Sequence, residues 1–251
     1  MTALGGGVAA VALSACADRG APSVPGPFSA SGQLVAMSGG EAGPRAACFT
    51  CHGLDGGGDG AGAPRLSGVP AGYLLKQLED YASGRRADDT MSVVARRLSP
   101  EERRRVAFWY AGRPAAARNA GGASDEVEGR RLYHMGDPGR GLQPCAACHG
   151  RSGEGGGAGN PPLWGQPSPY LGEQLRRWKH SERRNDPRHV MLTISRRLTD
   201  AEIRSLADYA SALPGGPDAS ATAASPPASR PDPTGDVSAQ RPRAQVSAPE
   251  A

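Results

Sequence analysis

Two segments of the chain place apolar residues at helical spacing directly behind a polar capping pattern. Residues 99–102 read Ser-Pro-Glu-Glu, which is a capping box with proline at the first helical position. Residues 199–202 read Thr-Asp-Ala-Glu and repeat the box. The apolar residues behind them recur at the spacing of one helix face: Val106, Trp109 and Tyr110 in the first segment, and Ile203, Leu206, Ala207 and Ala210 in the second. The pattern predicts a helix in each segment.

Each of these helices is preceded by another helical segment, at residues 71–81 and 169–178. We find no convincing alternation of apolar and polar residues that would predict a strand, so the expected fold class is all-α. Of 251 residues, 36 are Gly and 23 are Pro, while 38% are hydrophobic and 5% aromatic. So little apolar mass favours small domains that need a bound group to complete their cores.

An internal repeat divides the middle of the chain into two halves. Residues 48–53, Cys-Phe-Thr-Cys-His-Gly, recur as residues 145–150, Cys-Ala-Ala-Cys-His-Gly, at an offset of 97. Glycine-rich loops, a proline segment and a Tyr-Leu-x-x-Gln-Leu segment follow at the same offset, and later landmarks follow at an offset of 100. So many landmarks in one order indicate a duplicated domain. We place the first domain at residues 33–113, a linker at 114–124 and the second domain at 125–213.

The two ends of the chain differ in composition from these domains. Residues 1–15 are small and apolar and end in Leu-Ser-Ala before Cys16, which resembles the cleavage box of a bacterial lipoprotein. We interpret residues 1–15 as a signal peptide, Cys16 as a lipidation site and residues 16–32 as a flexible tether. A plain signal peptide with a stray thiol is the alternative. Residues 214–251 are rich in proline and poor in large apolar residues, which predicts a disordered tail. A periplasmic protein tethered to a membrane is therefore expected.

The motif C-x-x-C-H, present in both halves, is the attachment motif for c-type haem. It predicts two covalently bound haem groups with iron. The expected thioether-forming residues are Cys48, Cys51, Cys145 and Cys148, and the expected proximal iron ligands are His52 and His149. A thioredoxin-like site needs no such histidine, and cysteine pairs 97 residues apart do not suit a compact zinc site. Structural disulfides are a further alternative.

A methionine thioether suits the second axial position of an electron-transfer haem, because His/Met ligation raises the reduction potential. Met91 and Met191 occupy equivalent places in the repeat and are the expected ligands. Met37 and Met135 lie upstream of the cysteines, and we interpret them as packing residues. Three histidines have no counterpart in the other half, and we interpret them as surface or supporting groups: His134, His180 and His189.

Pro64 and Pro161 each follow their histidine by twelve residues. A rigid proline at this place can direct its carbonyl to the second ring nitrogen of His52 or His149, which would fix the orientation of the ring. An ordinary turn proline is the alternative interpretation.

The formal net charge is +4, from 29 Lys and Arg against 25 Asp and Glu. A nucleic-acid-binding domain needs a strongly basic face, so no nucleic-acid partner is expected. Most of these charges are expected on solvated helix faces.

The ordered set of motifs in each half resembles the di-haem cytochrome c4 family. These motifs are C-x-x-C-H-G, P-x-L-x-G, Y-L-x-x-Q-L, a methionine and L-[ST]-x-x-E, and they cover residues 33–213. The resemblance implies two tandem class I cytochrome c domains, each wrapped around one haem and related by a pseudo-two-fold axis. It also implies a periplasmic carrier between redox proteins, with a quinol-oxidising complex as donor and a haem–copper terminal oxidase as acceptor. Arg65 and residues 67–69 depart from the form of residues 163–166, close to the expected domain interface.

Three functions are compatible with these motifs. The leading hypothesis is an electron carrier, because an iron with methionine on its second face has no open position for a substrate. A di-haem enzyme of the peroxidase or thiosulfate-oxidising type would need an iron that lacks Met91 or Met191. A fixed cytochrome subunit of a larger dehydrogenase or oxidase complex would use the same chemistry with another partner. We therefore predict an electron-transfer protein and not an enzyme.

Overall fold

The computed structural model of the protein describes residues 31–116, 127–157 and 159–215. Several sequence predictions lie outside these residues. They concern the signal peptide, the lipidation site Cys16, most of the tether, the linker from residue 117 on, and the tail from residue 216 on.

The described residues form helices joined by loops, without any strand, which confirms the all-α prediction. The first domain consists of α1 (Gly32–Ser38), η1 (Gly40–Ala42), η2 (Pro44–Ala46), α2 (Phe49–His52), α3 (Ala71–Ser83), α4 (Met91–Arg97) and α5 (Pro100–Ala111). The second consists of α6 (Val127–Met135), η3 (Pro138–Arg140), α7 (Ala146–His149), α8 (Ser168–Lys179), η4 (Pro187–His189), α9 (Val190–Arg196) and α10 (Asp200–Ser211). The α-helices of the two halves correspond one to one.

Both predicted capping boxes are present. The Ser99 hydroxyl accepts a hydrogen bond from the Glu102 amide at 3.3 Å, and the Glu102 carboxylate accepts one from the Ser99 amide at 3.0 Å. Thr199 and Glu202 make the same pair of bonds at 3.2 and 2.7 Å. These bonds satisfy amide groups that would otherwise be unpaired at the helix start, so α5 and α10 begin where the sequence predicts.

In each domain the first helix packs across the last one at a glycine. A Cβ atom on Gly32 would lie 2.2 Å from the Arg105 carbonyl oxygen of α5. A Cβ atom on Gly129 would lie 2.3 Å from the Ser205 carbonyl oxygen of α10. The backbones of the first and last helix of each domain therefore approach more closely than they could if the glycine carried a side chain. Gly32, which we had assigned to the tether, is part of α1, because Ser31 caps the helix by accepting a bond from the Leu34 amide at 3.1 Å.

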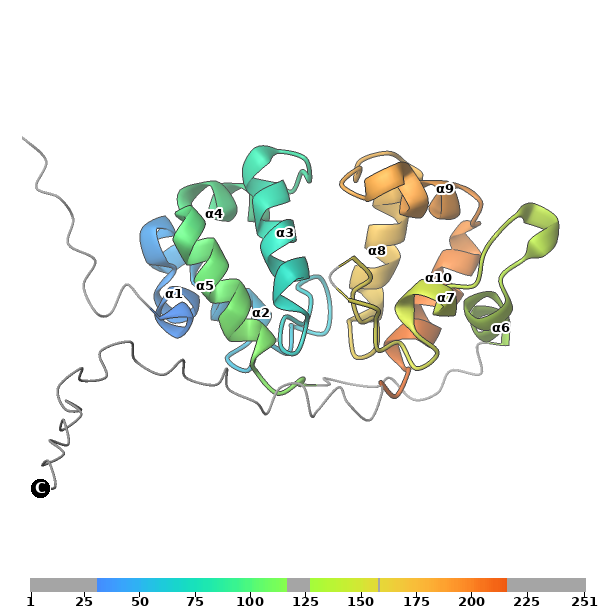
Figure 1. Ribbon diagram of the computed structural model, residues 1–251, viewed down its shortest axis with the longest axis horizontal. Helices are drawn as coiled ribbons and strands as arrows, with labels where there is room; N and C mark the ends of the chain where they lie inside the picture. Colours follow the sequence, from blue (N-terminus) through green and yellow to red (C-terminus); the bar gives the residue numbers. More distant parts are fainter. Residues whose placement is uncertain (1–30, 117–126, 158, 216–251) are drawn as a thin grey trace, which may run out of the picture.

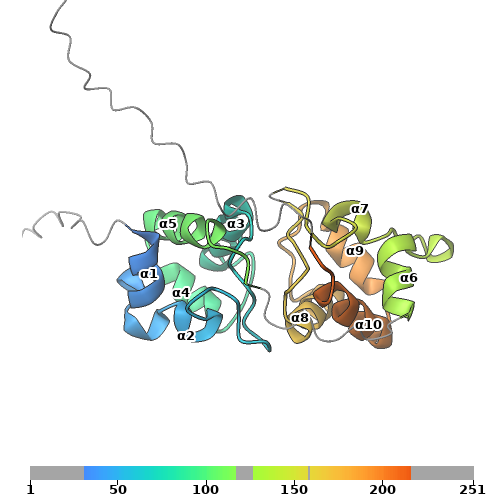
Figure 2. The same cartoon turned by 90° about the horizontal axis from the view of Figure 1, so that it is seen from below.

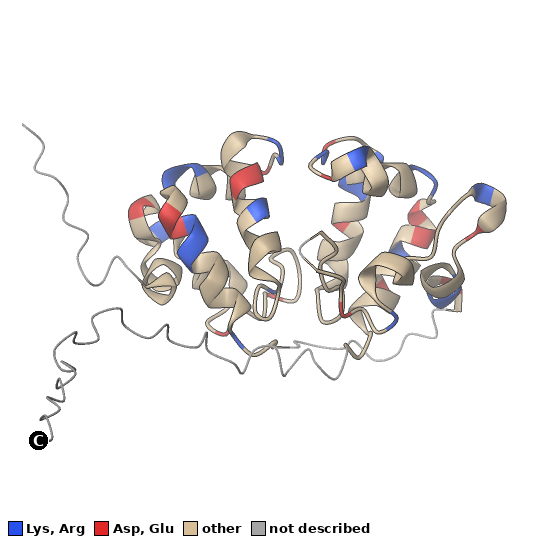
Figure 3. Ribbon diagram, in the orientation of Figure 1, with Lys and Arg blue, Asp and Glu red and all other residues tan. Residues whose placement is uncertain are grey.

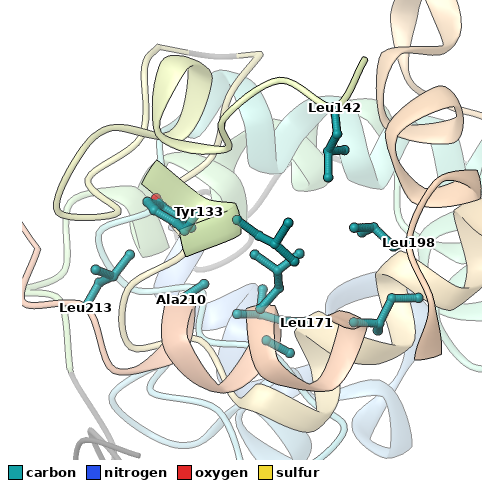
Figure 4. Close-up of a cluster of buried hydrophobic side chains, with 10 residues drawn as sticks. Tyr133, Leu142, Leu171, Leu198, Ala210 and Leu213 are labelled. Carbon is teal, nitrogen blue, oxygen red and sulfur yellow. The ribbon is translucent and has the colours of Figure 1, made fainter. Parts of the chain in front are cut away.

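Each domain has its own small hydrophobic core. The core of the second domain extends from Leu213 at one end to Leu142 and Leu198 at the other, with Tyr133 of α6 and Leu171 of α8 between them (Figure 4). The core of the first domain is built in the same way from Val35, Leu74, Leu98, Val106 and Tyr110.

The two domains lie side by side with α3 and α8 facing each other between them (Figure 1). The same arrangement is visible after a quarter turn, with α1 and α6 toward the outer ends (Figure 2). Basic and acidic residues are interspersed over the helices of both domains in the view of Figure 3. Residues of α3 and α8 and of the loops next to them make the contacts between the halves.

Replacing Gly129 by Ala should destabilise the folded protein by roughly 1–3 kcal/mol, although alanine is the better helix former. The added methyl group would overlap the Ser205 carbonyl and the Tyr209 Cβ atom, and neither belongs to a flexible side-chain end. Denaturant unfolding of the haem-loaded protein measures the loss. Gly159→Ala is the control, because a Cβ atom there meets nothing within 4 Å. Equal stability of the two variants would contradict the close helix crossing.

Candidate haem sites

The two C-x-x-C-H segments fold into matching short helical turns. Cys48 caps α2 and Cys145 caps α7, with nearly identical backbone angles. In each turn the first cysteine is half-buried and the second is exposed. The histidine that ends each turn is buried, at 7% exposure for His52 and 9% for His149. One turn of helix therefore places two thiols and an imidazole next to one another in both domains.

The orientation of each imidazole is fixed by a carbonyl of a distant residue. Nδ1 of His52 hydrogen-bonds the Pro64 carbonyl oxygen at 2.9 Å, and Nδ1 of His149 bonds the Pro161 carbonyl oxygen at 2.9 Å. Because the acceptor is a carbonyl, Nδ1 carries the proton, and Nε2 is left with its lone pair for a metal. Burial lowers the pKa of both histidines, which favours this neutral form, while the proline carbonyls act in the opposite direction.

A glycine in the left-handed region follows each histidine and turns the chain away from the helix. Gly53 has φ of 79° and Gly150 has φ of 82°, and a Cβ atom on Gly150 would overlap the Glu154 carboxylate. The chain then returns, so that the Gly58 amide donates to the His52 carbonyl at 2.8 Å and the Gly155 amide donates to the His149 carbonyl at 2.8 Å. This loop brings the proline back over the histidine ring.

The thiols suit thioether formation better than the alternatives considered from the sequence. Burial raises the pKa of Cys48 and of Cys145 to about 11. A redox C-x-x-C site needs the opposite, a cysteine whose pKa is lowered so that it reacts as a thiolate. The four cysteines belong to two separate domains, and among the described residues no three His, Cys, Asp or Glu side chains gather as a metal cluster. Two thiols beside one free imidazole nitrogen, in each domain, match the requirements of haem c.

Met91 and Met191 stand at equivalent helix starts. Met91 is the first residue of α4, and its amide donates to the Asp88 carboxylate at 2.9 Å. Met191 is the second residue of α9, and the next amide, of Leu192, donates to Asp186 at 3.2 Å. Both methionine side chains are half-buried. An aspartate just upstream thus fixes the backbone at each methionine.

The three residues inserted before Met191 form η4. Within it, Arg188 and His189 have φ of 61° and 54°. Residues other than glycine adopt this backbone conformation at a cost in free energy. The first domain reaches its methionine without such a turn.

The remaining methionines and histidines differ in their surroundings. Met37 is half-buried in α1, but Met135 is 62% exposed at the end of α6, so the interpretation of Met135 as a packing residue was wrong. It is the last residue of α6. His134 Nε2 hydrogen-bonds the Tyr209 hydroxyl at 2.7 Å, while His180 and His189 are exposed.

Arg65, the residue that broke the repeat pattern, lies at the interface between the domains. Its amide donates to Gln166 Oε1 at 3.0 Å, and its carbonyl accepts from Gln166 Nε2 at 2.9 Å. Its guanidinium donates to the Trp164 carbonyl at 2.8 Å and lies 4.5 Å from the centre of the Trp164 ring. Burial lowers the pKa of Arg65 to about 10, which leaves it charged at neutral pH. Arg65, which departs from the repeat pattern, therefore makes a specific contact with the second domain.

A second buried network joins α3 to α8 with pseudo-two-fold symmetry. Arg86 donates to Gln174 at 2.7 Å and to the Tyr170 hydroxyl at 3.2 Å, across the interface. Arg183 makes the equivalent bonds to Gln77 at 3.1 Å and to the Tyr73 hydroxyl at 3.3 Å. Each guanidinium also lies over an aromatic ring of its own domain, Tyr81 or Trp178.

The role of these residues was missing from the sequence analysis. All four pairs, namely Tyr73 and Tyr170, Gln77 and Gln174, Tyr81 and Trp178, and Arg86 and Arg183, obey the offset of 97. Polar residues repeated on a buried helix face were the available signal. Apolar spacing, which predicted the helices, does not reveal such a network because its members are mostly polar.

Comparisons with known proteins agree with this geometry. The family model for cytochrome c matches residues 37–109 and 126–213. A thiosulfate dehydrogenase electron acceptor from Stutzerimonas stutzeri is 42% identical over 206 residues, which cover 81% of this chain and 91% of that protein. A cytochrome c4 from Thiocapsa roseopersicina is 34% identical over 69% of this chain and 91% of that protein.

Among solved structures, thiosulfate dehydrogenase (TsdBA) from Marichromatium purpuratum superimposes with a TM-score of 0.66 and 41% identity over 73% of this chain. This chain spans 39% of the length of that protein. The duplicated turn, the two cores and these similarities lead to one assignment. The chain belongs to the cytochrome c family as a di-haem class I cytochrome of the cytochrome c4 type, an electron-transfer protein with two covalently bound haem c groups.

Proposed function

We propose that this protein accepts electrons from a thiosulfate dehydrogenase and passes them through two His/Met-ligated haems to a further redox protein. The observation that carries the proposal is the 42% identity to a thiosulfate dehydrogenase electron acceptor, over 91% of that protein. Each haem, when bound, supplies a one-electron iron couple. The chain's own residues hold the group, fix its axial ligands and shield them from water.

In the proposed ligand set His52 and Met91 serve the first haem, and His149 and Met191 the second. The free Nε2 atoms of the histidines and the matched positions of the methionines at helix starts support this set. Cys48 with Cys51 and Cys145 with Cys148 form the thioethers, because each pair lies in the same helical turn as its histidine. Pro64 and Pro161 orient the rings.

The proposed location is the periplasm, with the protein tethered to a membrane through a lipid on Cys16. The lipoprotein-like box before Cys16 supports this location. Every helix in residues 31–116, 127–157 and 159–215 is too short or too polar to cross a bilayer. A lipid anchor followed by a chain rich in Pro and Ser would confine the carrier to the membrane surface and still let it reach its partners.

The similarity to dehydrogenase acceptors makes a thiosulfate dehydrogenase the proposed donor, in place of the quinol-oxidising complex that the family resemblance suggested. A haem–copper terminal oxidase remains the proposed acceptor. If this chain is instead a fixed subunit of the thiosulfate dehydrogenase, the complex between donor and carrier lasts longer, but the electron transfer is the same.

Thiosulfate should reduce both haems of the purified oxidised protein only when a catalytic thiosulfate dehydrogenase is added. In the proposed ligand set each iron has a histidine on one face and a methionine on the other, so it offers no position at which thiosulfate itself could bind and react. Stopped-flow absorbance of the reduced haem bands measures the rate, with thiosulfate alone and dehydrogenase alone as controls. Equal reduction by thiosulfate alone would make the protein an enzyme, and no reduction with the dehydrogenase would remove this donor.

Met191→Ala should open the second haem, so that one of two irons becomes high-spin and binds carbon monoxide. One of two methionine methyl signals should also disappear from the NMR spectrum of the reduced protein. Met135→Ala is the matched control, because that methionine is 62% exposed. An unchanged spectrum in Met191→Ala would remove this residue from the ligand set.

Cys16→Ser should move the protein from the membrane fraction to the soluble periplasmic fraction, because the thiol that carries the lipid is lost. Fractionation of cells that express the full chain, followed by detection of haem-stained protein, gives the distribution. Ser29→Ala in the same segment serves as the control. Continued membrane association of Cys16→Ser would exclude the lipid anchor.

A further inference from the structure

We propose that each domain holds the methionine loop of the other domain, through positioning residues on the two facing helices. Lys76 and Asp80 of α3 hold the loop that leads to Met191, and Arg177 of α8 holds the loop that leads to Met91. This inference rests on the ligand set of the proposed function. Its consequence is that the axial ligation of each haem depends on contacts with the opposite domain.

The loop before Met191 is fastened to the first domain at Asn185. The Asn185 side-chain amide donates to Asp80 at 2.7 Å and to Gln77 at 2.9 Å, and the Asn185 backbone carbonyl accepts from Lys76 Nζ at 2.8 Å. Asp80 is buried at 2% exposure and is also paired with Lys76 and Arg85. These hydrogen bonds from the neighbouring domain fix the residue at which the loop leaves the interface.

This anchorage matters because the chain beyond it is strained. Asn185 is followed by Asp186 and η4, where Arg188 and His189 take the left-handed conformation, and then by Met191. Residues other than glycine adopt this conformation at a cost in free energy, so the loop keeps this path only if its ends are fixed. The first domain holds the start of the loop through Asn185, and the next residue, Asp186, ties that start to the far end by accepting from the Leu192 amide.

The loop before Met91 receives the reciprocal contact. Arg177 Nη1 of α8 donates to the Ala87 carbonyl and to the Asp88 carboxylate, both at 3.2 Å. Asp88 in turn accepts from the Met91 amide at 2.9 Å through its other oxygen. The second domain therefore contacts the carboxylate that holds Met91 at the start of α4.

The two contacts differ in strength. Lys76 and Asn185 meet over the carboxylate of Asp80, which is only 3% exposed although Lys76 itself is 36% exposed, while Arg177 and Asp88 are each 27% exposed. Water and salt screen the Arg177–Asp88 pair, in which both groups reach solvent, more than the bonds made to the buried Asp80 carboxylate. The loops that face each other between α3 and α8 carry residues of both signs (Figure 3). We therefore expect a larger effect at the second haem than at the first.

The test uses the full-length, haem-loaded protein and two variants that act across the interface. Lys76→Met removes a first-domain contact, and Arg177→Met removes a second-domain contact. Lys179→Met and Arg176→Met are the matched controls, because Lys179 pairs with Asp200 and Arg176 with Glu173, both within the second domain. The readouts are the two methionine methyl NMR signals, the two midpoint potentials and the affinity of each ferric haem for added imidazole, which competes with methionine.

In Lys76→Met the Met191 signal should shift or broaden, the second haem should lose potential and its imidazole affinity should rise roughly tenfold, as a lost charge-assisted hydrogen bond implies. The Met91 signal should stay unchanged. In Arg177→Met the pattern should reverse, with a smaller effect. Lys76→Arg should restore the parent behaviour.

Several results would overturn this inference. Changes confined to the haem of the mutated domain, or variants equal to their controls, would show that the loops are independent of the opposite domain. If Lys76→Met fails to fold, the partly exposed Arg177→Met decides alone. Absence of both methionine signals in the parent protein would refute the proposed ligand set, a failure distinct from that of the positioning contacts.

Discussion

The hydrogen bond from histidine Nδ1 to a proline carbonyl connects the chemistry of this protein to its architecture. It has the same length, 2.9 Å, in both domains. On one side it fixes the imidazole whose free Nε2 would bind the haem iron in the proposed ligand set, and on the other it involves the loop that returns over the histidine. In the first domain the residue after that proline, Arg65, is held by Gln166 of the second domain. The orientation of the His52 ring is thus linked to the domain interface, because Pro64 and Arg65 are neighbours in the chain.

Two of the buried charges at the interface are guanidinium groups that face amides and hydroxyls and have no carboxylate partner there. Arg86 and Arg183, both nearly fully buried, donate to glutamine and tyrosine oxygens and lie over aromatic rings. Burying a charge costs free energy unless hydrogen bonds replace the water. Because the partners come from both domains, the network is satisfied only when the domains are together, which opposes their separation.

Much of the fold was predictable because local chemistry determines it. The capping boxes fixed the starts of α5 and α10, and the repeated C-x-x-C-H-G motif with a proline twelve residues later gave the histidine geometry. The contacts that failed to appear in the sequence analysis depend on residues distant in the chain. Gly32 and Gly129 look like ordinary loop glycines until the last helix packs against them, and Arg86 looks like a surface charge until the second domain covers it. Met135 was misjudged because it is the last residue of α6, where the side chain is 62% exposed although Leu132 and Tyr133 of the same helix are in the core.

The two kinds of interface contact differ in what they require of a duplicated chain. The α3–α8 network pairs each residue with partners at the equivalent places in the other half, as in a symmetric dimer of identical domains. Such contacts could form before the two domains were joined. The bond between Arg65 and Gln166 is different, because the equivalent positions hold Pro162 and Val69, which cannot make it. An asymmetric contact of this kind can arise only after the two halves are parts of one chain, because each half must then accumulate its own substitutions. The interface therefore combines a part that is retained in both halves with a part that has diverged at Arg65 and Gln166, while the histidine–proline geometry is retained in both domains.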